Sequence, residues 1–228
     1  LRNLRPLPPR GGETRLGTWK SNFTQWAPVW AAVRGLESTL NGDAVLMAPA
    51  GGGAPQYVVT WPGRNTPGAA AEVSATPGAR LTLVTDDTDT AREFAAGQGL
   101  ASLSSLALMS ADPADLPQVP QLPEDADLTL TESRDYSVVE INAFGEPVAR
   151  GRIAGGEGFA VFGGMDIRRP DPDHTMETAV LAALAEEAAA RDLPLILMPA
   201  LPKSGFWYAR QGWTAEAEVL TFMRTLDA

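Results

Sequence analysis

The single histidine, His174, is the first candidate for acid–base chemistry in this chain of 228 residues. Imidazole is the side chain that most readily gains and loses a proton near neutral pH, so it is the usual proton carrier in enzymes. His174 stands directly before a segment that is predicted to be helical, and this position favours a role at the helix start over catalysis. A lone histidine also excludes metal sites built from several imidazoles and argues against a Ser-His-Asp triad. No metal site is predicted.

Other familiar catalytic patterns are missing from the sequence. It has no cysteine, which excludes disulfides, thiolate metal ligands and a cysteine nucleophile. Two glycine-rich segments, 51–53 and 155–158, resemble nucleotide-binding loops, but neither leads from a strand into a helix, as the dinucleotide fingerprint requires. A phosphate-loop lysine and a Gly-x-Ser-x-Gly elbow are also absent from the sequence.

Charge and composition narrow the possible partners. The net charge of -10 and the isoelectric point near 4.6 argue against binding to a nucleic-acid backbone, which requires a basic face. No stretch approaches the roughly 20 apolar residues that span a membrane, and no signal peptide is evident. We therefore expect a cytoplasmic protein without a nucleic-acid or membrane partner. The sequence does not predict its oligomeric state.

A long internal repeat is the strongest pattern in the chain. Residues 81–110 and 195–223 each predict an apolar strand, a short helix with an aromatic residue, a glycine turn and a closing strand. Leu81 and Leu195 are separated by the same interval as Met109 and Met223. Such a repeat predicts two copies of one fold, with chance recurrence of a common strand-helix-strand pattern as the alternative.

The remaining elements follow from apolar periodicity. A helix is expected over 22–40, with an apolar face at three- and four-residue spacing and a stop at Asn41-Gly42, and a second helix over 176–191. Segment 62–79 is weakly patterned and no helix is expected there. Further strands are expected at 44–48, 57–61, 127–131, 136–142, 148–154, 159–168 and 195–198. The last of them follows a helix, a position that favours parallel pairing with its neighbour.

A proline-rich segment divides the chain. Residues 111–126 carry four prolines with aspartate and glutamate between them, a composition typical of a linker. The expected organisation is an incomplete N-terminal module over 1–112, a linker over 113–126 and a nearly complete C-terminal module over 127–228.

Three segments of the second half follow a known pattern: GMDIRRP at 164–170, HTMETAVL at 174–181 and FWYARQGW at 206–213. Through these segments the second half resembles the GNAT superfamily of acyl-CoA-dependent N-acetyltransferases. The resemblance extends over about 127–226, whereas the first half is similar only through a leading helix and its closing segment, like a truncated copy. The fold that it implies is α/β (α+β), a mixed sheet with flanking helices in two modules.

The resemblance also implies an activity and a site. The activity is transfer of an acetyl or other acyl group from acyl-CoA, with acetyl-CoA as co-substrate, to the primary amine of a small molecule. The family's tyrosine, which protonates the leaving thiolate, matches Tyr208, and its carboxylate base matches Asp166. The implied cofactor-binding residues are Ile167, Arg168 and Arg169, which would pair with the pantetheine arm, and Thr175, Met176, Glu177 and Thr178, which would face the pyrophosphate.

One loop departs from the family's pattern. Residues 171–177 contain no glycine or arginine, and Asp171 and Asp173 would repel a pyrophosphate. Arg168 and Arg169, just upstream, could compensate. The alternative is therefore a degenerate GNAT-like protein that binds a small molecule or a partner without catalysing transfer, so enzymatic activity stays open at this point.

Overall fold

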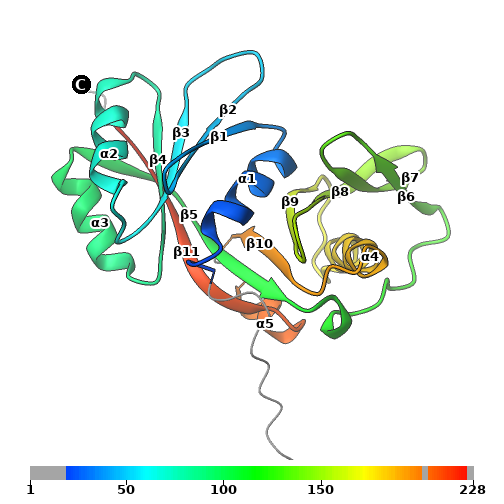
Figure 1. The fold of residues 1–228 in the computed structure, drawn as a ribbon. Coiled ribbons are helices and arrows are strands. Elements are labelled where there is room, and N and C mark those ends of the chain that lie inside the picture. Colours follow the sequence, from blue (N-terminus) through cyan, green and yellow to red (C-terminus); the bar gives the residue numbers. More distant parts are fainter. Residues whose placement is uncertain (1–18, 202–204, 225–228) are drawn as a thin grey trace, which may run out of the picture.

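A computed structural model describes residues 19–201 and 205–224, which form one large sheet flanked by helices (Figure 1). The helices are α1 (Phe23–Val33), α2 (Thr66–Ala75), α3 (Thr88–Gly97), α4 (Thr175–Ala190) and α5 (Gly205–Arg210), with a short 3-10 helix η1 (Pro113–Asp115). The strands are β1 (Glu37–Asn41), β2 (Ala44–Ala48), β3 (Gln56–Thr60), β4 (Arg80–Thr85), β5 (Leu100–Ala111), β6 (Ala126–Glu132), β7 (Ser137–Ala143), β8 (Glu146–Gly155), β9 (Ala160–Ile167), β10 (Ile196–Ala200) and β11 (Thr214–Arg224). The expected mixed sheet with flanking helices is confirmed.

The sheet contains two parallel pairs within an otherwise antiparallel arrangement. Its strand order is β1-β2-β3-β4-β11-β5-β10-β9-β8-β7-β6. The parallel pairs are β3 with β4, joined by α2, and β9 with β10, joined by α4. Parallel neighbours require a crossover connection, and a helix supplies it in both places.

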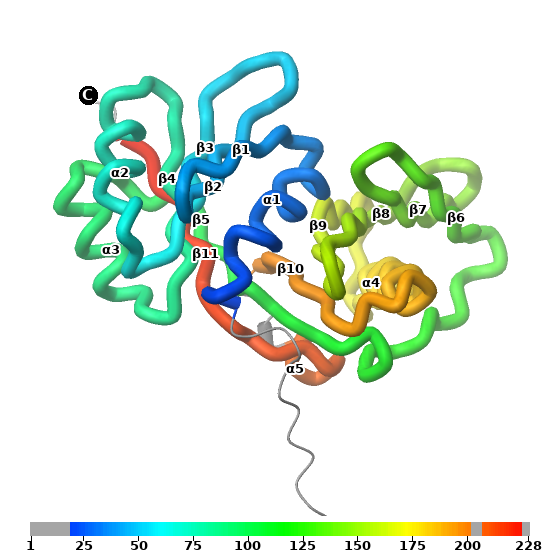
Figure 2. The backbone as a smooth tube through the Cα atoms, viewed as in Figure 1, coloured from blue at the N-terminus to red at the C-terminus, as the bar shows by residue number. Residues whose placement is uncertain are grey.

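The last strands of the two halves exchange places. The segments 81–110 and 195–223 have the same order, β4-α3-β5 and β10-α5-β11, as the repeat predicts. However, β11 lies between β4 and β5, and β5 lies between β11 and β10. Figure 2 shows β11 running back from the second half of the chain alongside β5 to reach β4. The division into modules 1–112 and 127–228 with a linker over 113–126 stays a prediction.

Alternating side chains divide the core between the two faces of the sheet. Val84 and Val161 pack with α1, whereas Leu83 packs with α2 and α3, and Phe162 packs with α4. The α1 layer is anchored by Trp26, which is fully buried and whose indole N–H donates to the Trp19 carbonyl at 2.9 Å. One face is therefore covered by α1 and the other by the remaining long helices.

The prediction of a helix over 22–40 is wrong in its C-terminal part, because α1 is shorter. It ends at Val33, where the N–H groups of Gly35 and Leu36 bond back to the carbonyls of Ala32 and Ala31. Gly35 has φ 71°, a left-handed conformation that ends a helix with this pair of bonds. Residues 37–41 form β1, and Asn41 is its last residue before the turn to β2, so the apolar spacing at Leu36 misled the sequence prediction.

The helix α2 was missed by the sequence prediction. Its buried residues are mostly small, namely Thr66, Ala69, Ala70 and Val73, so the segment has no strong apolar stripe. The first half thus has a crossover helix, and the expectation that segment 62–79 contains no helix is wrong. The first half has one antiparallel strand fewer than the second half. The strands β1 to β3 precede its crossover helix α2, whereas β6 to β9 precede the crossover helix α4.

The other expected elements are confirmed. The strands β2, β3 and β6 to β10 and the helix α4 lie within one or two residues of their expected bounds, and β10 is parallel to β9. None of the helices in the described ranges is long and apolar enough to cross a membrane.

Candidate functional site

The parallel strands β9 and β10 separate soon after they begin. They pair only at Ile196 with Ala160 and Leu197 with Val161, whereas β3 and β4 pair along their whole length. The pairing of β9 with β8 shifts register between Arg150 and Arg152, and Gly164 has φ 61°. A bulge of this kind bends a strand, and here it turns the end of β9 away from β10. In parallel sheets ligands bind outside the carboxyl ends of such strands.

The end of β9 presents one backbone edge to this gap. The N–H of Arg168 donates to the Val148 carbonyl at 2.8 Å and is therefore occupied by β8. Backbone groups alternate along a strand, so the N–H of Ile167 faces the opposite edge, toward β10. Arg168 and Arg169 have exposed side chains beyond the strand. Of the three residues expected to bind pantetheine, Ile167 has the suitable backbone direction.

The first turn of α4 is partly occupied by the protein itself. The Glu177 N–H donates to the Asp171 carboxylate at 3.0 Å, and the Thr178 N–H donates to the His174 carbonyl at 2.9 Å. The N–H groups of Thr175 and Met176 make no hydrogen bond to the described part of the chain. Asp171 therefore lies where an anion would approach the helix, and two of the four expected N–H groups remain for a ligand.

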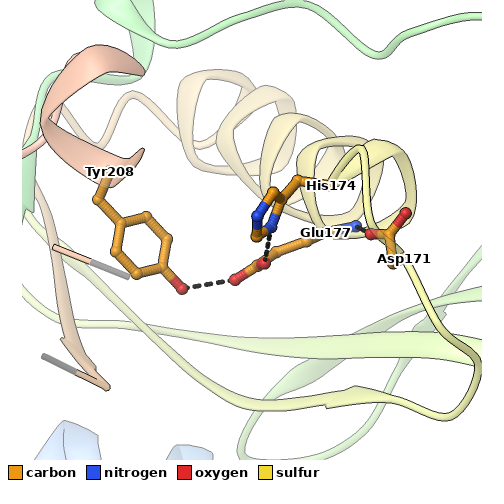
Figure 3. Close-up of polar contacts among 4 residues, drawn as sticks. All are labelled: Asp171, His174, Glu177 and Tyr208. Carbon is orange, nitrogen blue, oxygen red and sulfur yellow. Dashed lines mark hydrogen bonds and ion pairs between the residues drawn. The ribbon is translucent and has the colours of Figure 1, made fainter. Parts of the chain in front are cut away.

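A carboxylate links two of the candidate acid–base residues, Tyr208 and His174 (Figure 3). The Tyr208 hydroxyl donates to Glu177 Oε1 at 2.6 Å, and His174 Nδ1 lies 2.9 Å from Glu177 Oε2. The Trp207 ring stacks on the His174 imidazole with ring centroids 4.6 Å apart. The sequence assigned Glu177 only a backbone role. Its position three residues after His174, on the same helix face, was the available signal for a side-chain role.

This environment keeps the phenol protonated. Burial, followed by the hydrogen bond to Glu177 and the charge of Glu177, raises the pKa of Tyr208 well above its ordinary value of 10.0. The Tyr208 side chain is only 4% exposed, so water does not relieve this effect. Tyr208 thus retains its proton at neutral pH, and in this arrangement that proton is directed at Glu177.

The raised pKa predicts alkaline instability. A group with a folded-state pKa above its unfolded value contributes stability in full below pH 10, and this contribution is lost as pH rises further. The free energy of unfolding of the wild type should therefore fall by about 1.4 kcal/mol per pH unit above that pH, relative to Tyr208→Phe. Urea unfolding of both proteins from about pH 8 to 11 measures the difference in their free energies of unfolding. The expected slope corresponds to roughly one titrating proton. Parallel pH profiles would contradict it.

The expected base lies on the other face of β9. Met165 and Ile167 pack in the core cluster of α4, so Asp166 between them points to the opposite face. Its Oδ2 atom lies 3.2 Å from Arg150 Nη2 and 3.1 Å from Arg168 Nε. The structure thus pairs Asp166 with two arginines and does not bring it next to Tyr208. The role of either residue in catalysis stays a prediction.

Comparison with known proteins identifies the fold. No protein-family model and no curated protein matches the sequence. Among solved structures, a GCN5-related N-acetyltransferase from Kribbella flavida matches with a TM-score of 0.67 and 16% identity, over 92% of this chain and 97% of that one. A GCN5-related N-acetyltransferase-like protein from Streptococcus suis matches with a TM-score of 0.57 and 14% identity, over 86% and 92%.

A third match has a repeated architecture. A tandem GNAT protein from the clavulanic acid biosynthesis pathway matches with a TM-score of 0.55 and 13% identity, over 78% of this chain and 77% of that one. At these identities the likeness establishes the fold alone. The chain has the fold of the GNAT N-acetyltransferases.

Proposed function

We propose that this protein is an acyltransferase that moves an acetyl or other acyl group from acyl-CoA to the primary amine of a small molecule. The observation that carries the proposal is the separation of β9 from β10 after two residue pairs, at a bulge, within a GNAT fold. A bound acyl-CoA would supply an acyl carbon whose C–S bond breaks as its bond to the acceptor nitrogen forms. We place the reaction in the cytoplasm, and a chain without cysteine is compatible with that reducing compartment.

The residues at the site fit such a donor in part. The Ile167 edge of β9 can pair with the amides of a pantetheine arm, and the N–H groups of Thr175 and Met176 can bind phosphate oxygens at the start of α4. The Asp171 carboxylate opposes this phosphate binding. Tyr208 holds a proton that can be donated to the leaving thiolate, which then departs as a thiol, if its hydroxyl turns from Glu177. Asp166, or water, would accept the amine's proton.

The second candidate is a GNAT-fold protein that binds a small molecule or a partner without catalysing transfer. Two contacts favour it: Asp171 occupies the Glu177 N–H, and the Tyr208 proton is engaged by Glu177. Both contacts would have to yield before acyl-CoA could be bound and used. Measured binding of acetyl-CoA therefore separates the two candidates.

Neutralising Asp171 should strengthen acetyl-CoA binding. In Asp171→Asn the amide oxygen can still accept from the Glu177 N–H, so the helix keeps its cap while the negative charge is removed. A charge at a helix terminus is worth a few tenths to about 1 kcal/mol, so the dissociation constant should fall roughly two- to fivefold. Isothermal titration of the wild type and the variant with acetyl-CoA measures this.

The control is Asp173→Asn, which removes the same charge from an exposed residue of the same loop. It should change the dissociation constant less than Asp171→Asn does. If the wild type shows no binding at high micromolar acetyl-CoA and Asp171→Asn shows none either, the acyltransferase proposal fails and the non-catalytic candidate is favoured.

A further inference from the structure

A cavity of about 340 Å³ lies on the α1 face of the sheet, away from Tyr208 and the start of α4. It is bounded by the end of α1 and by strands of both halves. Gly163 and Gly164 of β9 line it on one side, and Pro199 of β10 lines it on the other. The cavity therefore reaches the place where β9 and β10 separate, but from the opposite face to α4.

The cavity carries two positive charges and no negative one. Arg34, the residue after α1, and Arg80, the first residue of β4, both line it, and no lining residue is acidic. Neither arginine forms a salt bridge with an acidic side chain of the described residues. Arg80 is exposed at the mouth of the cavity, whereas Arg34 is half-buried, and a half-buried charge normally has an ionic partner.

Arg34 is held in place by neutral groups. Its Nη1 atom donates to Gln56 Oε1 at 2.9 Å, and its guanidinium lies 4.8 Å from the centroid of the Trp30 ring. Burial, and second the charge of Arg80, lower the pKa of Arg34, so the charged form is disfavoured in the absence of an anion. An anion in the cavity would offset both effects.

A buried chain of hydrogen bonds fixes this arrangement. Gln56 Nε2 donates to Thr82 Oγ1 at 2.7 Å, and Thr82 Oγ1 and Thr221 Oγ1 are 2.9 Å apart. All three side chains are buried, and they cross β3, β4 and β11 in one row. The row orients the Gln56 amide, whose oxygen then faces Arg34. A preorganised guanidinium loses less conformational freedom when it binds a ligand.

The rest of the lining is partly apolar and partly neutral polar. Trp30, Leu103, Leu106 and Pro199 supply the apolar walls beside the two arginines, and Gln56, Ser104 and Thr221 add an amide and two hydroxyl groups. Leu103 is 47% exposed, which is high for a large apolar side chain. A cavity of this size with apolar walls and a few convergent polar groups is typical of a site for a small molecule.

We propose that this cavity binds a small organic anion, whose carboxylate or phosphate pairs with Arg34 and Arg80 while an apolar part contacts Trp30 and Leu103. Guanidinium groups bind both kinds of anion through paired, charge-assisted hydrogen bonds. The assignment of this anion to a substrate rests on the proposed function. If the protein transfers acyl groups, the anionic group is part of the acceptor, which is then an amine that also bears a carboxylate or phosphate. Anion binding itself does not require acyl transfer.

The binding test uses three probes of similar shape: phenylacetate, phenyl phosphate and the neutral phenylacetamide. Ligand-observed NMR in the absence of acetyl-CoA gives their dissociation constants. At least one anion should bind roughly ten- to a hundredfold more tightly than phenylacetamide, and Arg34→Gln and Arg80→Gln should each weaken it by a similar factor. The control, Arg92→Gln on the exposed side of α3, should bind as the wild type does.

A stability measurement separates ligand binding from a structural role. Arg80→Gln removes a repulsion, so without a ligand it should unfold at a temperature no lower than the wild type. It should also gain less in unfolding temperature when the tighter anion is added. This variant keeps the test valid if Arg34→Gln fails to fold. Equal binding of phenylacetamide and the anions, no anion binding in the millimolar range, or unchanged binding in both variants would overturn the proposal.

Two further comparisons identify the source of the anion. The ratio of phenylacetate to phenyl phosphate affinity distinguishes a carboxylate ligand from a phosphate ligand. If acetyl-CoA displaces the bound probe, the arginines hold donor phosphates and the assignment to the acceptor is overturned.

Thiol release from acetyl-CoA should be faster with phenylalanine than with phenylalaninamide. If anions bind as expected but no amine releases thiol, the proposed function fails while the anion site stands.

Discussion

Replacing Tyr208 by phenylalanine should lower the rate of acyl transfer about a hundredfold while leaving the affinity for acetyl-CoA nearly unchanged. A hydroxyl that protonates a leaving thiolate acts mainly as negative charge develops on sulfur, so its loss lowers kcat rather than ground-state binding. Burial and Glu177 raise the pKa of Tyr208, so the hydroxyl is protonated at neutral pH, but the same effects make it a weaker acid until its contact with Glu177 is broken. The structure also gives the substitution a second effect, because the hydrogen bond to Glu177 is lost.

The measurement follows thiol release from acetyl-CoA with a thiol reagent, and the cysteine-free chain contributes no background. Tyr57→Phe removes the same hydroxyl from a half-buried residue of β3 and should behave like the wild type. Urea unfolding of both variants shows whether a rate loss reflects unfolding. A rate for Tyr208→Phe within threefold (roughly 0.6 kcal/mol) of the wild type would exclude Tyr208 as the acid.

The two halves of the chain should not fold when they are produced separately. In a fragment 113–228, β11 has no neighbouring strand, because it pairs only with β4 and β5 of the other half. In a fragment 1–112, β5 loses both of its neighbours, β11 and β10. Each fragment would expose a long apolar strand with unpaired backbone groups, which favours unfolding or aggregation.

Circular dichroism and size-exclusion chromatography of each fragment, and of the two refolded together, measure this. We expect a native spectrum and a single heterodimer peak only for the mixture. As a control, the full chain can be folded first and then cut at a protease site inserted within 117–124, where no helix or strand is interrupted. The cut protein should stay together. A fragment that folds alone into a stable monomer would show that the exchanged strands are dispensable.

The local pattern of apolar and polar residues was sufficient to predict most of the helices and strands. The alternation in β7 and β8 and the helical stripe with Val180 and Leu184 in α4 follow from side-chain direction, which depends only on local backbone geometry. The equal order of elements at 81–110 and 195–223 was also evident from the sequence. The helix α2 and the true end of α1 were not, because alanine gives little periodic contrast and because Gly35 ends a helix whose apolar spacing continues in the sequence through Leu36.

Only the tertiary structure decided which elements meet. The apolar pattern indicates that β11 is buried but not that β4 and β5 flank it, since every strand edge offers the same backbone N–H and C=O groups and the choice of partner depends on packing across the whole sheet. The same holds for polar side chains that are distant in sequence. Glu177 meets Tyr208 because α4 and α5 pack on one face of the sheet, and Arg34 and Arg80 are neighbours because the end of α1 and the start of β4 line the same cavity. The charges in each site were given by the sequence, but their proximity and the partial burial of Glu177 and Arg34 came from the packing.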